Sequence, residues 1–257
     1  MVRIAILLLV LLIVALQTWA TRYRTTRWTA PLFVAIYPIA ADDSETTRAY
    51  VAALSAADFQ PIDRFFAREA SRYGVAAREP VRTRFRAELH AKPPPRAAGA
   101  GVLGNVLWSL QLRYWAWRVS VNGGGHDPED VQIFVLYHDP AESPVLPHSL
   151  GLERGLIGVV YAFAAPWMNG TNDVVIAHEL LHTLGASDKY DFADDSPRFP
   201  DGYGDPRQVP LYPQRTAELM AGRRMLAADR WEQATDLASV VIGPASAREI
   251  RWPQPAN

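Results

Sequence analysis

The segment 176–188 places two histidines and a glutamate among aliphatic side chains, in the order IAHELLHTLGASD. His178 and His182 are four residues apart, so on a helix they lie one turn apart on one face and both imidazoles can point at a common atom. Glu179 is rotated by about 100° from His178, which keeps its carboxylate beside that atom but outside its coordination sphere. These offsets fit a zinc ion with a water molecule that the glutamate deprotonates.

A zinc ion that keeps a position open for water usually has three protein ligands, so the two histidines need a partner. Gly185 is able to adopt a positive φ and end the helix, so that the chain reverses and carries Asp188 back toward the metal. Pro210 and Pro213 favour a turn before Glu218 rather than the later helix on which a glutamate ligand would lie. Asp188 is therefore the preferred third ligand, and the carboxylates that remain as alternatives are those of Asp191, Asp194, Asp195 and Glu218.

The stretch HELLHTLGASD resembles the extended zinc motif of the metzincin metallopeptidases, HExxHxxGxx followed by a third ligand. That ligand is histidine in most metzincins. Here the matching residue is Asp188, and an aspartate at this position resembles the snapalysin-like branch of the family. The family also places a methionine in a tight turn beneath the zinc, for which Met220, in the region 217–222, is the matching residue. The resemblance implies a zinc-dependent metalloendopeptidase with Glu179 as general base and one catalytic Zn²⁺. The implied ligands are His178, His182 and Asp188, and the implied structural residues near the metal are Gly185 and Met220.

Apolar periodicity predicts the elements that must position this motif. Four strands are expected, the second of them half-buried, at 32–37, 81–89, 131–137 and 156–163. Helices are expected from Ser44, after Pro61 as far as Gly74, at 102–119, and at 172–185 for the zinc helix, with Thr171, Asn172 or Asp173 as its N-cap. This order predicts an α/β (α+β) fold, a single domain with one twisted mixed sheet. The metzincin resemblance adds a small C-terminal subdomain, and it makes 156–163 the edge strand along which a substrate peptide lies.

The N-terminus carries an unbroken apolar run at residues 4–16, directly after Arg3. Its length fits the core of a signal peptide, and extended to residue 20 it only just reaches the length of a membrane span. We therefore expect residues 1–27 to be a signal peptide or a single-pass anchor with a short tether, and 28–257 to be the zinc peptidase domain. The protein is expected to be exported to the cell envelope, either membrane-anchored or periplasmic or extracellular.

Composition limits the other classes of function. The formal net charge of -1 and the scattered arginines argue against a nucleic-acid partner, and the absence of cysteine excludes disulfides and thiolate ligands. A peptide or protein substrate is the expected partner, together with a membrane if the N-terminal segment is retained. For the acidic segment 188–205, a solvated loop is favoured over a Ca²⁺ site. Tyr203 and Tyr212 are two hydroxyls that could assist an oxyanion, and nothing in the sequence selects either.

Two alternatives to the metzincin interpretation stay open. In the first, the protein is a non-catalytic envelope protein whose zinc is structural, which would require a fourth protein ligand in place of water. In the second, it is a gluzincin-like peptidase in which Glu218 is the third ligand. The discriminating feature for the first is whether a fourth protein group fills the open position at the metal, and chelator-sensitive cleavage of a peptide library would favour the enzyme.

Overall fold

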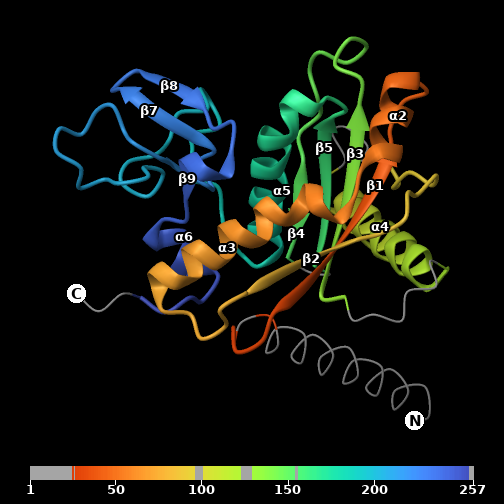
Figure 1. Ribbon diagram of the computed structural model, residues 1–257, viewed down its shortest axis with the longest axis horizontal. Coiled ribbons are helices and arrows are strands. Elements are labelled where there is room, and N and C mark those ends of the chain that lie inside the picture. Colours follow the sequence, from red (N-terminus) through yellow and green to blue (C-terminus); the bar gives the residue numbers. More distant parts are fainter. Residues whose placement is uncertain (1–24, 26, 96–100, 123–128, 154–155, 255–257) are drawn as a thin grey trace.

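The central element of the computed structural model is a twisted five-stranded sheet in the order β2-β1-β3-β5-β4 (Figure 1). The structure describes residues 25, 27–95, 101–122, 129–153 and 156–254. The strands are β1 (Leu32–Ala40), β2 (Val81–Phe85), β3 (Val131–His138), β4 (Leu150–Leu152) and β5 (Ile157–Phe163). β1, β2, β3 and β5 are parallel, and only β4 runs antiparallel to its neighbour β5. The sheet is therefore mixed, and β4 forms one of its edges.

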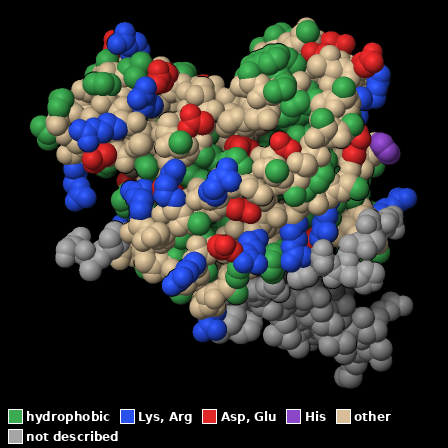
Figure 2. Space-filling view, in the orientation of Figure 1, with side chains coloured by type: hydrophobic (Ala, Val, Ile, Leu, Met, Phe, Trp, Pro, Cys, Tyr) green, Lys and Arg blue, Asp and Glu red, His purple; other side chains and the backbone are tan. Residues whose placement is uncertain are grey.

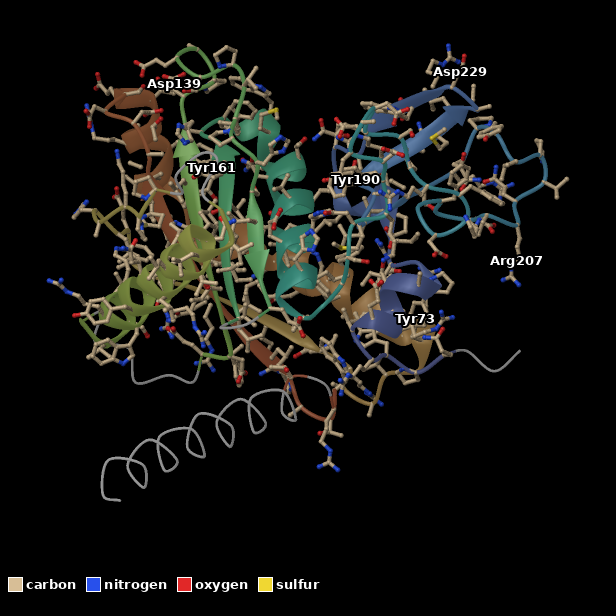
Figure 3. All side chains as sticks on the ribbon, turned by 180° about the vertical axis from the view of Figure 1, so that it is seen from behind. Tyr73, Asp139, Tyr161, Tyr190, Arg207 and Asp229 are labelled. Atoms are coloured by element: carbon tan, nitrogen blue, oxygen red, sulfur yellow. The ribbon has the colours of Figure 1, made fainter. Side chains whose placement is uncertain are left out.

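Helices cover both faces of the sheet, which explains why β1 and β3 are continuous apolar runs. One face carries α2 (Glu45–Ala53), α3 (Gln60–Tyr73) and α5 (Asn169–Thr183), whose apolar side chains form the larger core with the sheet. The other face is covered by α4 (Val102–Asn122), which packs Leu112 and Ala116 on β1, β3 and β5. Seen from behind in Figure 3, α4 crosses this face in front of the strands.

The C-terminal part forms a smaller lobe of short elements, as expected. It contains β6 (Ala217–Glu218), β7 (Arg223–Ala227), β8 (Arg230–Gln233), β9 (Val240–Val241) and α6 (Pro244–Glu249). The described residues also form short 3₁₀ helices at Ala56–Phe59, Pro166–Met168 and Leu237–Ser239. Figure 2 shows a notch at the top of the molecule between this lobe and the lobe of the sheet. The mixed sheet, the long helix α5 and the smaller lobe agree with the predicted α+β fold class.

Several predicted elements differ from the structure at their ends, most clearly β2 and α5. The second strand ends at Phe85 instead of 89. The helix α5 starts at Asn169, and Met168 at its N-cap makes no side-chain capping bond. Asn172, one of the predicted caps, instead accepts a hydrogen bond from the Phe163 N–H at 3.1 Å and donates to the Phe163 carbonyl at 2.9 Å. Its side chain ties the helix to β5, so the helix continues back to Asn169.

The prediction that 156–163 is the edge strand was wrong. β5 lies between β3 and β4, and the edge is the three-residue strand β4. Gly158 in β5 reflects a close approach, because a Cβ there would lie 2.5 Å from the Ile133 side chain. The predicted signal peptide or anchor lies outside the described residues, apart from Thr25 and Arg27. Within the part of the chain that the structure describes, no helix is both long and apolar enough to cross a membrane.

Candidate metal centre

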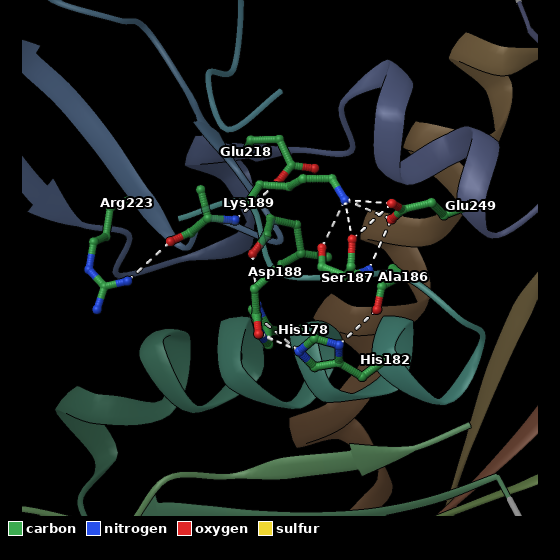
Figure 4. Close-up of polar contacts among 11 residues, drawn as sticks. His178, His182, Ala186, Ser187, Asp188, Lys189, Glu218, Arg223 and Glu249 are labelled. Carbon is green, nitrogen blue, oxygen red and sulfur yellow. Dashed lines mark hydrogen bonds and ion pairs between the residues drawn. The ribbon is translucent and has the colours of Figure 1, made fainter. Parts of the chain in front are cut away.

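The two histidines of α5 bring their ring nitrogens to one point. The Nε2 atoms of His178 and His182 lie 3.0 Å apart, and the rings are nearly perpendicular at 81°. α5 is buried between the sheet and the C-terminal lobe, with Leu180 and Leu181 fully buried on its other sides. The helix is held by this apolar packing, so the imidazoles project from a fixed scaffold toward the C-terminal lobe (Figure 4).

The chain reverses directly after the helix and returns Asp188 to the histidines. Gly185 has a φ of 100°, which only glycine adopts at little cost, and the Ala186 N–H donates to the Leu181 carbonyl at 3.0 Å. After this reversal, Oδ1 of Asp188 lies 3.1 Å from the Nε2 atom of each histidine. Ligand atoms around a tetrahedral zinc lie about 3.3 Å apart, so the three atoms have nearly the required spacing.

Backbone carbonyls fix which nitrogen of each imidazole faces Asp188. Nδ1 of His178 lies 3.0 Å from the carbonyl oxygen of Leu219, and Nδ1 of His182 lies 2.8 Å from that of Ala186. A carbonyl oxygen only accepts, so both Nδ1 atoms carry hydrogen and both Nε2 atoms of the neutral rings offer lone pairs. Sequence reasoning did not identify these two carbonyls, which orient the histidines as the outer-shell partners of metal ligands do.

The three converging atoms attract positive charge. Burial opposes ionisation of Asp188, but hydrogen bonds with His178 and His182 outweigh it and hold the pKa of Asp188 well below its usual range. Burial likewise works against the charged form of His178, but the hydrogen bond with Asp188 raises the pKa of His178 above its usual value. With neutral imidazoles, three acceptors face one another without a donor between them, so a cation at their centre would satisfy all three.

The carboxylate of Glu179 lies beside this point and lacks a partner on one oxygen. Ligand atoms of His178, Glu179 and His182 lie within 4.8 Å of one another, so the Glu179 carboxylate belongs to the same cluster as the two histidines. Glu179 is 5% exposed, and its Oε2 atom is buried with no hydrogen-bond partner there. Burial raises its pKa, which the nearby imidazoles partly oppose. A buried carboxylate oxygen without a donor fits a position where a water molecule would bridge to a metal.

The predicted methionine turn lies against the zinc helix. Ala221 and Gly222 donate their N–H groups to the Glu218 carbonyl at 3.1 and 2.8 Å, which closes a tight turn around the fully buried Met220. The turn reaches the site through the Leu219 carbonyl described above. The structure thus brings the turn and His178 into direct contact.

The side chain of Glu218 points away from the histidines. Its Oε1 atom accepts from the Gly243 N–H at 3.1 Å and the Ser246 hydroxyl at 2.7 Å, and its Oε2 atom accepts from the Ala221 N–H at 3.0 Å. Glu218 is fully buried and lies in β6, not on a helix. Its carboxylate joins the turn to the start of α6, an arrangement that disfavours it as a metal ligand.

The other carboxylates considered as third ligands, those of Asp191, Asp194 and Asp195, make contacts within or beside the loop that follows Asp188. Asp191 accepts from the Ala193 N–H at 2.9 Å and Asp194 from the Ser196 hydroxyl at 2.7 Å, while Asp195 pairs with Arg223 at 3.0 Å. These contacts build local turns in the acidic segment. The hydroxyls of Tyr203 and Tyr212 lie 2.9 Å apart and bond to each other.

An unpredicted network holds the two neighbours of Asp188. The ammonium of Lys189 donates to the Ser187 carbonyl at 2.9 Å and to both carboxylate oxygens of Glu249 at 2.7 and 2.8 Å. Ser187 donates its N–H and its hydroxyl to the same carboxylate. Glu249 is the last residue of α6, so this helix anchors the segment that presents Asp188, as Figure 4 shows. No local pattern in the sequence could have revealed this network, because Lys189 and Glu249 are 60 residues apart.

Comparison with known proteins identifies no family. No protein-family model matches the sequence, and no curated protein matches it either. Among solved structures, the chain is similar to wild-type OgpA from Akkermansia muciniphila, at 13% identity and a TM-score of 0.39, over 89% of this chain and 63% of that one. It is also similar to catalytically inactive OgpA from the same organism in complex with an O-glycopeptide substrate, glycodrosocin, at 13% identity and a TM-score of 0.37, over 86% and 59%. The chain spans less than two thirds of these proteins, and likeness at this level assigns it neither a family nor an activity.

Proposed function

We propose that this protein is a zinc-dependent metalloendopeptidase of metzincin type, with Asp188 as third ligand. The observation that carries the proposal is the convergence of three lone-pair atoms, from His178, His182 and Asp188, at 3.0 to 3.1 Å from one another. The buried, unpartnered oxygen of Glu179 beside them supports a catalytic rather than a structural role. A structural zinc site would use a fourth protein ligand, and Glu218 is bonded elsewhere.

The residues of the site have separate roles in peptide hydrolysis. A bound Zn²⁺ would act as a Lewis acid and lower the pKa of its water to about 7. Glu179 removes a proton from the attacking water as its oxygen bonds to the scissile carbonyl carbon, and delivers that proton to the amine nitrogen as the C–N bond breaks. The raised pKa of Glu179 suits an acid and base that must hold this proton between the two steps.

The edge strand β4 is the proposed place for the substrate backbone. A Cβ on Gly151 would lie 2.4 Å from the Glu179 carbonyl oxygen and 2.6 Å from the His182 Cβ, so β4 lies directly against the zinc helix. Its other side has no strand partner within the described sheet. An extended peptide that pairs with this edge would therefore pass beside the metal ligands. The proposal keeps export to the cell envelope, by a signal peptide or an anchor in residues 1–27.

The decisive variant is Glu179→Gln in the full chain, with Glu232→Gln on the exposed strand β8 as the matched control. Zinc content is measured by elemental analysis, and cleavage with a mixed peptide library. We expect Glu179→Gln to keep one zinc and lose about 10²- to 10⁴-fold in activity, whereas His178→Ala loses the metal. Peptidase activity equal to that of the control would refute the role of Glu179. Absence of cleavage in the wild type, with unfolding on chelation, would favour the structural zinc instead.

A further inference from the structure

The helix α4 is apolar on two opposite sides. One side packs on the sheet through the buried Leu112 and Ala116 and the half-buried Trp108, Trp115 and Val119. The other side presents large apolar side chains to solvent, each at least half exposed: Val102, Leu103, Val106, Leu107, Leu110, Tyr114, Trp117 and Val121. We call these eight residues the outer stripe of α4. At about 100° per residue, all eight lie within an arc of about 140° on one face of a helix about 30 Å long.

The outer stripe has the composition of a helix that lies in a membrane interface. α4 contains no acidic residue, and its two basic residues, Arg113 and Arg118, are exposed. At about 100° per residue, these arginines lie about 70° to either side of the centre of the stripe. Tyr114 and Trp117 contact each other within the stripe, with ring centroids 5.9 Å apart. Aliphatic and aromatic side chains flanked by arginines are typical of helices whose apolar face enters the headgroup region while the guanidinium groups reach phosphates.

The path of the chain also favours a lipid surface. Trp28 fixes the start of the domain, since its Nε1–H donates to the Ile250 carbonyl at 2.8 Å. Only eleven residues, 17–27, lie between Trp28 and the end of the apolar run at Leu16, a span of at most about 40 Å. In Figures 1 and 3, β1 starts near the bottom of the described chain, and α4, which packs on β1, lies at about mid-height. An apolar run inserted in a bilayer would tether the domain close to the lipid surface. The effective concentration of lipid near the outer stripe would then be high.

Charge complementarity favours a lipid surface over a second copy of the chain as the partner of the outer stripe. In a symmetric pair of α4 helices, Arg113 and Arg118 would face another α4, which offers no carboxylate. Anionic headgroups supply the missing negative charge. We propose that the outer stripe of α4 docks the domain on the surface of a bilayer that contains anionic lipids. This surface is distinct from the metal centre, because α4 covers the sheet face opposite to α5.

The absence of cysteine from the sequence allows a direct test in the full chain. Leu110→Cys, at the centre of the stripe, and Val145→Cys, a control that is 84% exposed between β3 and β4, are each labelled with an environment-sensitive fluorophore. Both proteins are reconstituted in vesicles of phosphatidylcholine with phosphatidylglycerol. Quenching is measured with nitroxide-labelled lipid and with aqueous iodide.

We expect the label at position 110 to be quenched several-fold more by nitroxide lipid than the label at 145, and to be protected from iodide. In the Arg113→Glu, Arg118→Glu background, or in vesicles of phosphatidylcholine alone, the lipid quenching should decrease. Equal iodide quenching at both positions would overturn the proposal, because the stripe would then face water. Protection from iodide without lipid quenching would also overturn it, since a second copy or another segment of the chain would then cover the stripe.

Discussion

Glu218→Gln tests how the methionine turn supports the metal site. The carboxylate of Glu218 accepts from Ser246, Gly243 and Ala221, and hydrogen bonds to a charged group contribute about 1.5 to 3 kcal/mol each. Glutamine keeps the oxygen that faces Ser246 and Gly243, but it turns an amide N–H₂ toward the Ala221 N–H, donor against donor. One charge-assisted bond is lost, so we expect a destabilisation of about 2 kcal/mol.

The metal should respond to the same change, because the turn carries the Leu219 carbonyl that orients His178. For a chain of this length, 2 kcal/mol corresponds to a Tm lower by about 4 to 8 °C. Loosening of an outer-shell partner lowers zinc affinity by about tenfold or more. Both quantities are measured on the full chain, the Tm by calorimetry and the affinity by competition with a chromogenic chelator. Glu232→Gln, the same chemical change on an exposed strand, is the control.

The outcome also decides between the two candidate third ligands. At saturating zinc, Glu218→Gln should still bind one equivalent, whereas Asp188→Ala should bind none with measurable affinity. Loss of the metal in Glu218→Gln with retention in Asp188→Ala would show that Glu218 is the ligand and would refute the reasoning above. A Tm and a zinc affinity equal to those of Glu232→Gln would show that the turn does not support His178.

Two further predictions concern stability around α5. Burial raises the pKa of Asp173 from about 3.8 to about 7. Between these two pH values the folded state keeps a proton that the unfolded state has lost. The free energy of unfolding therefore falls by up to about 4 kcal/mol as the pH rises through this window. Asp173→Asn should therefore have a higher Tm than the wild type at pH 8 and an equal Tm at pH 4; an equal Tm at both would contradict the burial argument. A Cβ on Gly151 would overlap the Glu179 carbonyl and His182, so Gly151→Ala should cost about 1 to 3 kcal/mol and weaken zinc binding in a zinc titration. Gly101→Ala, where a Cβ meets no atom within 4 Å, is its control, and indistinguishable results would show that β4 moves freely from α5.

The parts of the site that sequence predicted are those set by local geometry. The spacing of His178 and His182 fixes their common face on any α-helix, and Gly185 is the residue type that a reversal with positive φ requires. The predicted strands and helices were mostly correct for the same reason, since period 2 and period 3.6 are local patterns. Most of the contacts that orient the site are different in kind, because they join residues far apart in sequence, such as His178 and Leu219, which are 41 residues apart.

Elements without a pattern of their own could not be predicted. β4 has three residues, too few for an alternation, and its place at the edge follows from its pairing with β5. Because β4 was not predicted, the strand at 156–163 was wrongly expected to form the edge of the sheet. Similarly, the sequence favoured Asp188 over Glu218 only through Pro210 and Pro213, and it left Glu218 open as an alternative third ligand. Only the positions of Gly243 and Ser246 show that the Glu218 carboxylate is already occupied.

The long-range contacts also imply that the site is formed before the metal binds. Asp188 lies between Ser187 and Lys189, and both are bonded to Glu249 of α6. α5 is packed in the main core on the sheet, independently of any ligand. A small zinc domain whose ligands lie on otherwise unsupported segments gains its folding energy from the metal. Here the ligands lie on segments that apolar packing and ion pairs already hold, so zinc should add stability by mass action on a folded protein rather than cause it to fold.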